Sequence, residues 1–274
     1  MLMKRIFPVI KNILLLSIIF AALFTSCTRQ NYRDLTIVDG VLTVGVEIGY
    51  PPMEYYDTDG VTLLGFDIEL TKALADILGL SVNFIDTTWD GILPGLDTNR
   101  YDIAVNVTIL PERQERYNFT KPYIDSSIVI VSTVNSSINI EKAEDITGYR
   151  IAFQGDTTAQ YFTERLREQG IRFSSFSYDK IINCFNDLTI GRIDFVVTDN
   201  IAASFYTEKE NSNFIVRWQG EPDEFIAFCL KKGNEPLTIA LNNALGKLFN
   251  NGTIQEISKR ILGSGISPAI LELY

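Results

Sequence analysis

The chain has 274 residues, 46% of them hydrophobic, and carries a formal net charge of −10 with no histidine. An acidic chain lacks the basic surface that nucleic acids require, and the absence of histidine removes the commonest general base and any Ser-His or Cys-His nucleophile pair. The length allows one large domain or two lobes.

The N-terminal segment has the pattern of a secretory signal. Cations precede an apolar run of about 12 residues, too short to span a membrane, and small residues then lead to Cys27. The ending LFTSC resembles a bacterial lipoprotein cleavage box, with Phe24 where Leu is more usual. We expect residues 1–26 to be a signal peptide, Cys27 to carry the lipid, and residues 27–40 to be a linker. An uncleaved anchor and simple secretion are the alternatives.

The next part of the chain alternates apolar strands with helices. Strands are expected over 42–48 and 81–85, an amphipathic helix over 65–79, and a short helix over 89–96. This order of elements is typical of a largely parallel sheet.

The stretch YDIAVNVTILPERQERYNFTKPY, residues 101–123, predicts a buried strand with a polar end at Asn106 and Thr108, followed by a short helix that carries Arg113. Open α/β sheets bind ligands at the C-terminal ends of their strands. A guanidinium can donate two parallel hydrogen bonds to a carboxylate. Taken alone, the PER tripeptide favours the alternative that Arg113 is a surface charge or a structural ion-pair partner.

A second copy of this pattern favours a binding site. The segment from Leu188 through Arg192 and Asp194 into FVVTDN repeats the order of residues 96–108. Its strand ends at Thr198, Asp199 and Asn200. Two similar lobes, one presenting a cation and the other an anion, would suit a zwitterion.

The second half restarts the strand-helix pattern. The expected strands and helices are strands over 128–132, 150–154, 194–198, 214–218 and 225–230, and helices over 157–169, 179–190, 201–206, 237–250 and 253–262. Cys184 and Cys229 fall in apolar surroundings and are expected to be buried thiols, with a disulfide as the less favoured alternative. They are too few for a metal site, and we expect no metal and no cofactor.

Several acids have a structural interpretation. Asp67 and Glu69 lie at the start of a predicted helix, where carboxylates complement the dipole. Asp102 and Asp194, which recur in both copies of the repeat, are expected to be architectural.

The motifs YPPMEYYDTDG, LGFDIEL, WDGILPGL, YDIAVNVTILPER, FTKPY and GRIDFVVTD together resemble the family 3 solute-binding proteins, the extracytoplasmic receptors of polar amino-acid ABC importers. The resemblance covers about residues 42–262. It implies a two-lobed α/β fold of the type II periplasmic-binding-protein class, with two mixed sheets flanked by helices and joined by two hinge strands. Lobe 1 would comprise 41–124 plus 226–274, and lobe 2 would comprise 125–225.

The resemblance also implies ligand-binding roles. Arg113 matches the arginine that binds the ligand α-carboxylate, and Asp199 matches the aspartate that pairs with the α-ammonium. The other matched residues are Thr108 as a hydroxyl contact, Asn106 as a backbone carbonyl contact to the ammonium, Tyr50 and Trp89 as the aromatic sandwich, and Thr157 and Thr158 as the helix-start residues that complete the carboxylate site. Trp89 could alternatively be a core tryptophan.

Two positions depart from the family pattern. Leu110 replaces a usual Thr, so one polar group near the carboxylate is missing. Asp156 stands where a small residue is usual and would repel a carboxylate, unless it turns away as the cap of the following helix, which is our expectation.

Glu47 and Gln154 end matching strands of the two lobes, and we expect them to select among ligand side chains. Arg113 and Asp199 cancel the ligand's own charges, so Glu47 would be left without a partner. A buried carboxylate of this kind favours a cationic side chain such as Arg or Lys, or an amide donor such as Gln. The alternative is that Glu47 is partly solvated and recognises nothing.

These features predict a monomeric, membrane-tethered receptor without enzymatic activity, which captures a free amino acid by hinge closure and delivers it to a separately encoded permease and ATPase. One alternative is an enzyme similar to the cyclohexadienyl dehydratases on the same scaffold. Another is a standalone sensor for a membrane kinase or chemoreceptor.

Overall fold

The computed structural model describes residues 32–274, which form one compact unit. The predicted signal peptide, Cys27 and the first part of the predicted linker lie outside these residues. Within residues 32–274, no helix combines the length and apolar character needed to cross a membrane.

The first sheet has the order β4-β1-β5-β13-β6, and β7 also pairs with β13. The strands β4, β1 and β5 on one side of the sheet run parallel to one another, whereas β13 runs antiparallel to β5, β6 and β7. The strands are β1 (Val41–Val46), β4 (Ser81–Asp86), β5 (Ile103–Thr108), β6 (Tyr117–Phe119), β7 (Ile124–Ser126) and β13 (Glu224–Lys231). We call this sheet and its helices lobe 1.

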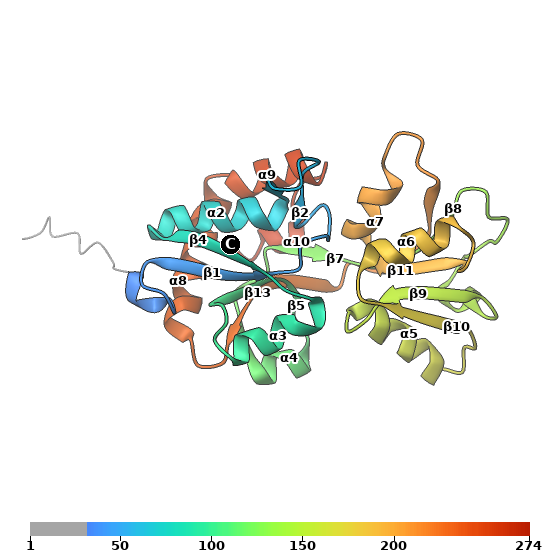
Figure 1. The fold of residues 1–274 in the computed structure, drawn as a ribbon, viewed down its shortest axis with the longest axis horizontal. Coiled ribbons are helices and arrows are strands. Elements are labelled where there is room, and N and C mark those ends of the chain that lie inside the picture. The colour runs from blue at the N-terminus through green and yellow to red at the C-terminus, as the bar shows by residue number, and fades with distance from the viewer. Residues whose placement is uncertain (1–31) are drawn as a thin grey trace, which may run out of the picture. The chain divides into compact units, whose positions relative to one another are not determined.

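Helices cover both faces of this sheet (Figure 1). On one face α2 packs against α8 and α9 over the larger apolar core, and on the other face α3 contacts β5 and β1. The helices are α2 (Phe66–Leu78), α3 (Trp89–Asp97), α4 (Pro111–Arg116), α8 (Glu235–Asn250), α9 (Thr253–Ile261) and α10 (Pro268–Leu271). Smaller elements are the turn η1 (Arg33–Leu35) and the hairpin of β2 (Tyr55–Tyr56) and β3 (Leu63–Leu64).

The second sheet has the order β10-β9-β11-β8-β12 and is also mixed. Its strands are β8 (Ile128–Thr133), β9 (Arg150–Gln154), β10 (Ser174–Tyr178), β11 (Phe195–Asp199) and β12 (Phe214–Gln219). Its helices are η2 (Ala143–Ile146), α5 (Thr158–Glu168), α6 (Ile181–Thr189) and α7 (Asn200–Thr207). We call this sheet and its helices lobe 2. Two mixed sheets flanked by helices confirm the predicted fold class, while the exact lobe limits stay a prediction.

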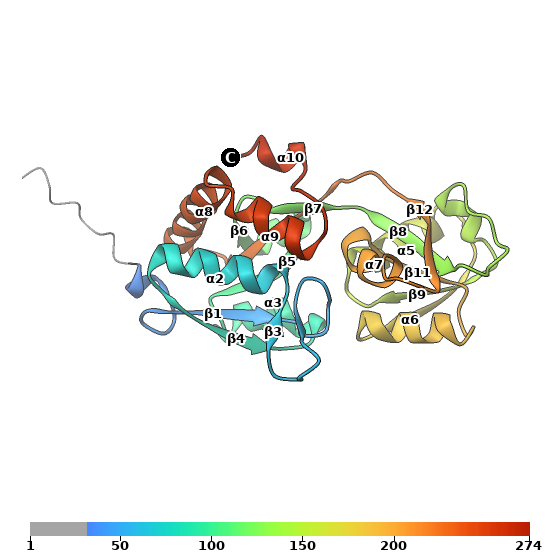
Figure 2. The same cartoon turned by 90° about the horizontal axis from the view of Figure 1, so that it is seen from above.

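The chain passes from lobe 1 to lobe 2 through β7 into β8 (Figure 2), and it returns through β13. The two crossing segments pair with each other, and Glu224 lies opposite Ser126. We call β7 and the start of β13, residues 124–126 and 224–226, the hinge strands.

The repeated aspartates hold equivalent strands together. Asp102 accepts hydrogen bonds from the backbone N–H of Thr43 at 2.7 Å and of Ile37 at 2.6 Å, which ties β1 to the start of β5. Asp194 accepts from the backbone and guanidinium of Arg150 and thereby ties β9 to β11. Their role in the structure is architectural, as predicted.

Asp67 is fully buried in the first turn of α2, beside the buried Glu54. Burial raises the pKa of Asp67, and the nearby side chains of Tyr123 and Glu54 oppose this shift. The expectation of a helix-start acid that simply complements the dipole is therefore incomplete for Asp67. Glu69, in contrast, forms an ion pair with Arg260 at the protein surface.

Cys184 and Cys229 are free, buried thiols. They belong to separate apolar cores, one in each lobe, so the less favoured disulfide does not form.

Candidate functional site

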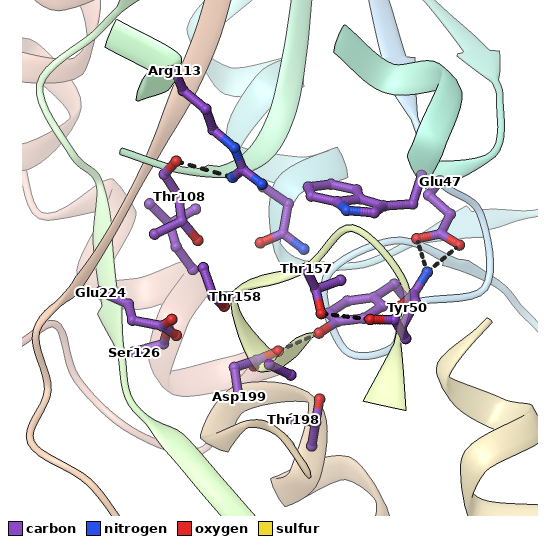
Figure 3. Close-up of a pocket in the computed structure, with 15 residues that line it drawn as sticks. Glu47, Tyr50, Thr108, Arg113, Ser126, Thr157, Thr158, Thr198, Asp199 and Glu224 are labelled. Carbon is purple, nitrogen blue, oxygen red and sulfur yellow. Dashed lines mark hydrogen bonds between the residues drawn. The ribbon is translucent and has the colours of Figure 1, made fainter. Parts of the chain in front are cut away.

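One pocket contains every residue that the sequence singled out for ligand binding (Figure 3). Its lining comprises the ten predicted residues Glu47, Tyr50, Trp89, Asn106, Thr108, Arg113, Gln154, Thr157, Thr158 and Asp199, and five others, Ser126, Ala159, Thr198, Glu224 and Ile226. The pocket therefore collects residues from the strand ends of both lobes and from the hinge strands. Their individual ligand contacts remain predictions.

Arg113 supplies the positive charge of the pocket. It lies on the short helix α4 and is 6% exposed. Its Nη1 donates to the carbonyl of Thr108 at 3.2 Å, and its Nη2 donates to the carbonyl of Asp156 at 3.3 Å. Its guanidinium carbon lies 5.9 Å from the ring centre of Trp89. No acidic side chain forms an ion pair with Arg113 among residues 32–274. A buried guanidinium with unused donors is suited to an external carboxylate.

A bulge in β5 places Asn106 at the pocket. The pairing of β5 with β13 shifts register between Val107 and Ala104, so that β5 carries one extra residue, and Asn106 has a positive φ of 56°. A bulge bends a strand and redirects its side chains. The Asn106 N–H donates to the Tyr123 hydroxyl at 3.0 Å, and contact of the Asn106 carbonyl with a ligand ammonium stays a prediction.

Asp199 supplies a negative charge from lobe 2. It ends β11 and caps α7, because its Oδ1 accepts a hydrogen bond from the Ala202 N–H at 2.8 Å. The Tyr50 hydroxyl of lobe 1 donates to its Oδ2. Burial raises the pKa of Asp199 above its ordinary value, while the hydrogen bond from Tyr50 opposes this shift. A ligand cation would oppose the effect of burial in the same way.

Thr157 and Thr158 lie at the start of α5, where the first backbone amides have no partner within the helix. Thr157 is the N-cap residue, and its hydroxyl donates to the Gln154 carbonyl at 2.7 Å. Such a helix start attracts a carboxylate.

The expectation that Asp156 caps α5 is wrong. The cap position belongs to Thr157, and Asp156 precedes it with a positive φ of 58°. The Asp156 residue is exposed and does not line the pocket, so solvent screens its charge from a bound carboxylate. Its carbonyl instead accepts hydrogen bonds from Trp89 and Arg113 of lobe 1.

Glu47 and Gln154 meet directly at the far side of the pocket. The Gln154 Nε2 donates to Glu47 Oε1 at 2.8 Å and Oε2 at 2.9 Å, and both residues are buried. The prediction treated Glu47 as lacking a partner; the structure gives it a neutral donor from the other lobe. Burial raises the pKa of Glu47 to about 7, although Gln154 and then Lys180 oppose the shift.

Trp89 serves both the core and the pocket. It is the first residue of α3, half-buried, and packs against the smaller apolar core of lobe 1. Its indole Nε1 donates to the Asp156 carbonyl at 2.9 Å, across the pocket mouth. The two alternatives considered for Trp89 are thus not exclusive.

Five hydrogen-bonded contacts join lobe 1 to lobe 2 around the pocket. They are Trp89 and Arg113 to the Asp156 carbonyl, Tyr50 to Asp199, Gln154 to Glu47, and Lys180 to the Ile48 carbonyl. The described structure is accordingly a closed form.

Sequence reasoning missed Glu224 and Ser126. Both belong to the hinge strands, and the Ser126 hydroxyl donates to Glu224 Oε2 at 3.1 Å. The available signal was an acid directly before the apolar run FIAFCL, at the predicted second crossing. The described residues contain no cluster of three or more potential metal ligands.

Two α/β lobes that enclose a polar pocket lined by charges of both signs are typical of a solute-binding protein. The chain belongs to the bacterial extracellular solute-binding proteins, family 3, whose model matches residues 42–264. It is 30% identical to the L-cystine-binding protein TcyJ of Escherichia coli (strain K12), over 92% of this chain and 96% of that protein.

Solved structures show the same likeness. The fold is similar to an ancestral arginine-binding protein bound to arginine, with a TM-score of 0.77, 30% identity, and coverage of 82% of this chain and 99% of the other. It is also similar to an ancestral amino acid-binding protein, AncCDT-1, described as a precursor of cyclohexadienyl dehydratase. There the TM-score is 0.73 and the identity 30%, with coverage of 81% and 95%.

Proposed function

We propose that the chain is the substrate-binding receptor of an amino-acid ABC importer, which clamps a free amino acid between its two lobes. The observation that carries this proposal is the buried Arg113, which has no acidic ion-pair partner among the described residues and lines the same pocket as Asp199. An α-amino acid brings a carboxylate for the first and an ammonium for the second.

The ligand class follows from the charges in the pocket. Three acids, Glu47, Asp199 and Glu224, line it with a single base, Arg113. A zwitterion adds one charge of each sign and leaves the acids in excess. A ligand with a second basic nitrogen reduces that excess, so we favour arginine or lysine, with glutamine next as a neutral donor to Glu47.

L-cystine is a second candidate because the relative TcyJ is named for binding it. Its distal ammonium would also place a basic nitrogen near Glu47. The distal carboxylate would need a separate partner, and Lys180, whose Nζ donates to the Ile48 carbonyl at 2.9 Å, is the cation beside Glu47.

The receptor would work at the extracytoplasmic face, anchored through a lipid on Cys27, and would deliver its ligand as a monomer to a separately encoded permease and ATPase. Ligand binding would neither form nor break a covalent bond.

The rival enzyme resembling cyclohexadienyl dehydratase is supported by the likeness to AncCDT-1. A standalone sensor would use the same pocket, so binding alone does not discriminate it from a transport receptor.

The test is thermal unfolding of the chain from residue 28 onward, stripped of carried-over ligand, with each common amino acid, cystine and prephenate. A ligand at 100 times its Kd contributes about 2.7 kcal/mol, which raises the Tm by roughly 5–10 °C in a protein of this size. A shift with arginine or lysine that vanishes in Glu47→Ala supports the cationic pocket. A shift with only apolar amino acids rejects that ligand class and keeps the receptor. Prephenate turnover without any amino-acid shift supports the enzyme.

A further inference from the structure

Glu224 is an acid of the pocket that lies in the hinge strands. It begins β13 in the hinge strands, is 9% exposed, and lines the same pocket as Arg113 and Asp199. Its carboxylate points from the hinge strands toward the middle of the pocket, on the side opposite Glu47 (Figure 3). A buried carboxylate at such a place requires partners that compensate its lost hydration.

The described residues give the buried Glu224 carboxylate few partners. Ser126 donates one hydrogen bond to Oε2 at 3.1 Å, and the Thr158 side chain lies close enough to favour the ionised form. Among residues 32–274 no Lys or Arg forms an ion pair with Glu224. Arg113, the one cation in the pocket lining, donates to the carbonyls of Thr108 and Asp156 instead.

Asp199 is the neighbouring acid. The negative charge of Asp199 is close enough to disfavour the ionised form of Glu224, as Asp223 also does more weakly. Tyr50 and the Ala202 N–H already donate to Asp199. A group that brings positive charge and several N–H donors between Asp199 and Glu224 would relieve the repulsion and satisfy both carboxylates.

We propose that Glu224 is a second ligand-binding carboxylate, which receives the α-ammonium of the bound amino acid together with Asp199. This inference rests on the proposed function and adds a ligand contact from the hinge strands. An ammonium has three N–H donors. Asp199, Glu224 and the Asn106 carbonyl provide one acceptor for each.

The arrangement makes amine binding sensitive to pH. Burial and then the effects of Asp199 and Asp223 raise the pKa of Glu224, while Thr158 and Ser126 lower it. Asp199 itself has a raised pKa, and Arg113 and Glu47 are the other charged residues of the pocket. An ammonium favours both ionised carboxylates, so affinity should fall as pH decreases and the carboxylates bind protons.

A ligand-and-protein cycle tests the role of Glu224. Isothermal titration calorimetry would compare wild type and Glu224→Gln with the best binder among L-arginine, L-lysine, L-cystine and L-glutamine, and with its 2-hydroxy-acid analogue. We expect Glu224→Gln to weaken amino-acid binding by about tenfold or more, as for loss of a charge-assisted hydrogen bond, and to leave binding of the analogue nearly unchanged. The affinity of the variant should also change less between pH 7 and pH 5 than that of wild type.

Matched variants separate ligand contact from hinge structure. Glu221→Gln removes an equal charge from an exposed position in the preceding segment and should leave affinity unchanged. Ser126→Ala removes the hydrogen bond within the hinge strands while keeping the carboxylate, and should retain the preference for the amine over the hydroxyl analogue.

The outcomes are distinct. Equal weakening of amino acid and analogue by Glu224→Gln, or unchanged binding of both, overturns this inference and leaves the proposed function intact. If wild type binds no amino acid, both the inference and the proposed function are overturned.

Discussion

The hydroxyl of Tyr50 in lobe 1 donates a hydrogen bond to the carboxylate of Asp199 in lobe 2. Asp199 is the residue proposed to bind the ligand ammonium, so a protein group occupies one of its oxygens in the closed structure. Under the proposed function, ligand recognition and the contact between the lobes would share this carboxylate.

Replacement of Tyr50 by Phe should destabilise the ligand-free protein more than the liganded one. Loss of the hydroxyl removes a hydrogen bond to a charged group and should lower the free energy of unfolding by about 1–2 kcal/mol without ligand. With saturating ligand, the ammonium still compensates Asp199, and the loss should be smaller. Urea unfolding with and without ligand measures both values; equal losses would contradict the shared-carboxylate model.

Arg113→Met should reduce ligand affinity by about 2–5 kcal/mol, because the carboxylate of the ligand would be buried without its cation. Calorimetric titration of the amino acid measures the change. Arg116→Met on the same helix is the control, since the Arg116 side chain is 68% exposed and pairs with Asp97 at the surface. A similar loss in both variants would assign the effect to helix α4 rather than to the pocket.

Glu47 should make the affinity for a cationic side chain depend on pH. Its pKa is raised to about 7 by burial, so below that pH the ligand-free protein holds a proton that a cation must displace. Affinity for L-arginine should rise by up to about tenfold per pH unit below pH 7 and level off above it. Glu47→Gln should make this profile less steep, leaving the contribution of Glu224 and Asp199, and Glu115→Gln, at an exposed position, should not change it. An unchanged profile in Glu47→Gln would exclude Glu47 as the titrating group.

Asp67→Asn should stabilise the ligand-free protein increasingly as pH rises. Burial raises the pKa of Asp67 to about 7, above its ordinary value of 3.8. The folded state therefore retains a proton that the unfolded state loses, and wild-type stability should decrease between about pH 4 and pH 7. The variant should lose the part of that decrease that Asp67 contributes and keep the part from Glu54, whose pKa burial also raises, whereas Asp76→Asn on the exposed face of α2 should keep all of it. Urea unfolding midpoints at pH 4.5, 6 and 8 would measure the pH dependence of stability in each protein. The same pH dependence in wild type and Asp67→Asn would reject Asp67 as the titrating group.

The sequence predicted the fold and much of the pocket because the relevant signals are local. Apolar strands followed by polar residues mark the strand ends, and Arg113 and Asp199 follow such strands in two similar segments. Features that depend on distant segments were not predictable in this way. The hydrogen bond between Gln154 and Glu47 joins positions 107 residues apart, and that between Ser126 and Glu224 joins positions 98 residues apart.

Backbone conformation was the other reason why the structure differs from the predictions made from the sequence. Asn106 and Asp156 both have positive φ, which side-chain chemistry alone did not predict. The expected cap at Asp156 was wrong by one position because the helix begins after Thr157. Both residues present a main-chain carbonyl near the pocket, and this is a group that every amino acid possesses.

The side chain at residue 156 can vary without loss of the hydrogen bonds that residue accepts from lobe 1. Trp89 and Arg113 both donate to the main-chain oxygen of residue 156, not to its side chain. Substitutions that preserve the local backbone, such as Asp156→Asn or Asp156→Gly, can change the surface charge at the mouth of the pocket without removing the acceptor. These two contacts between the lobes therefore do not depend on the side chain at residue 156, and alignments of related sequences would underrate the importance of this position.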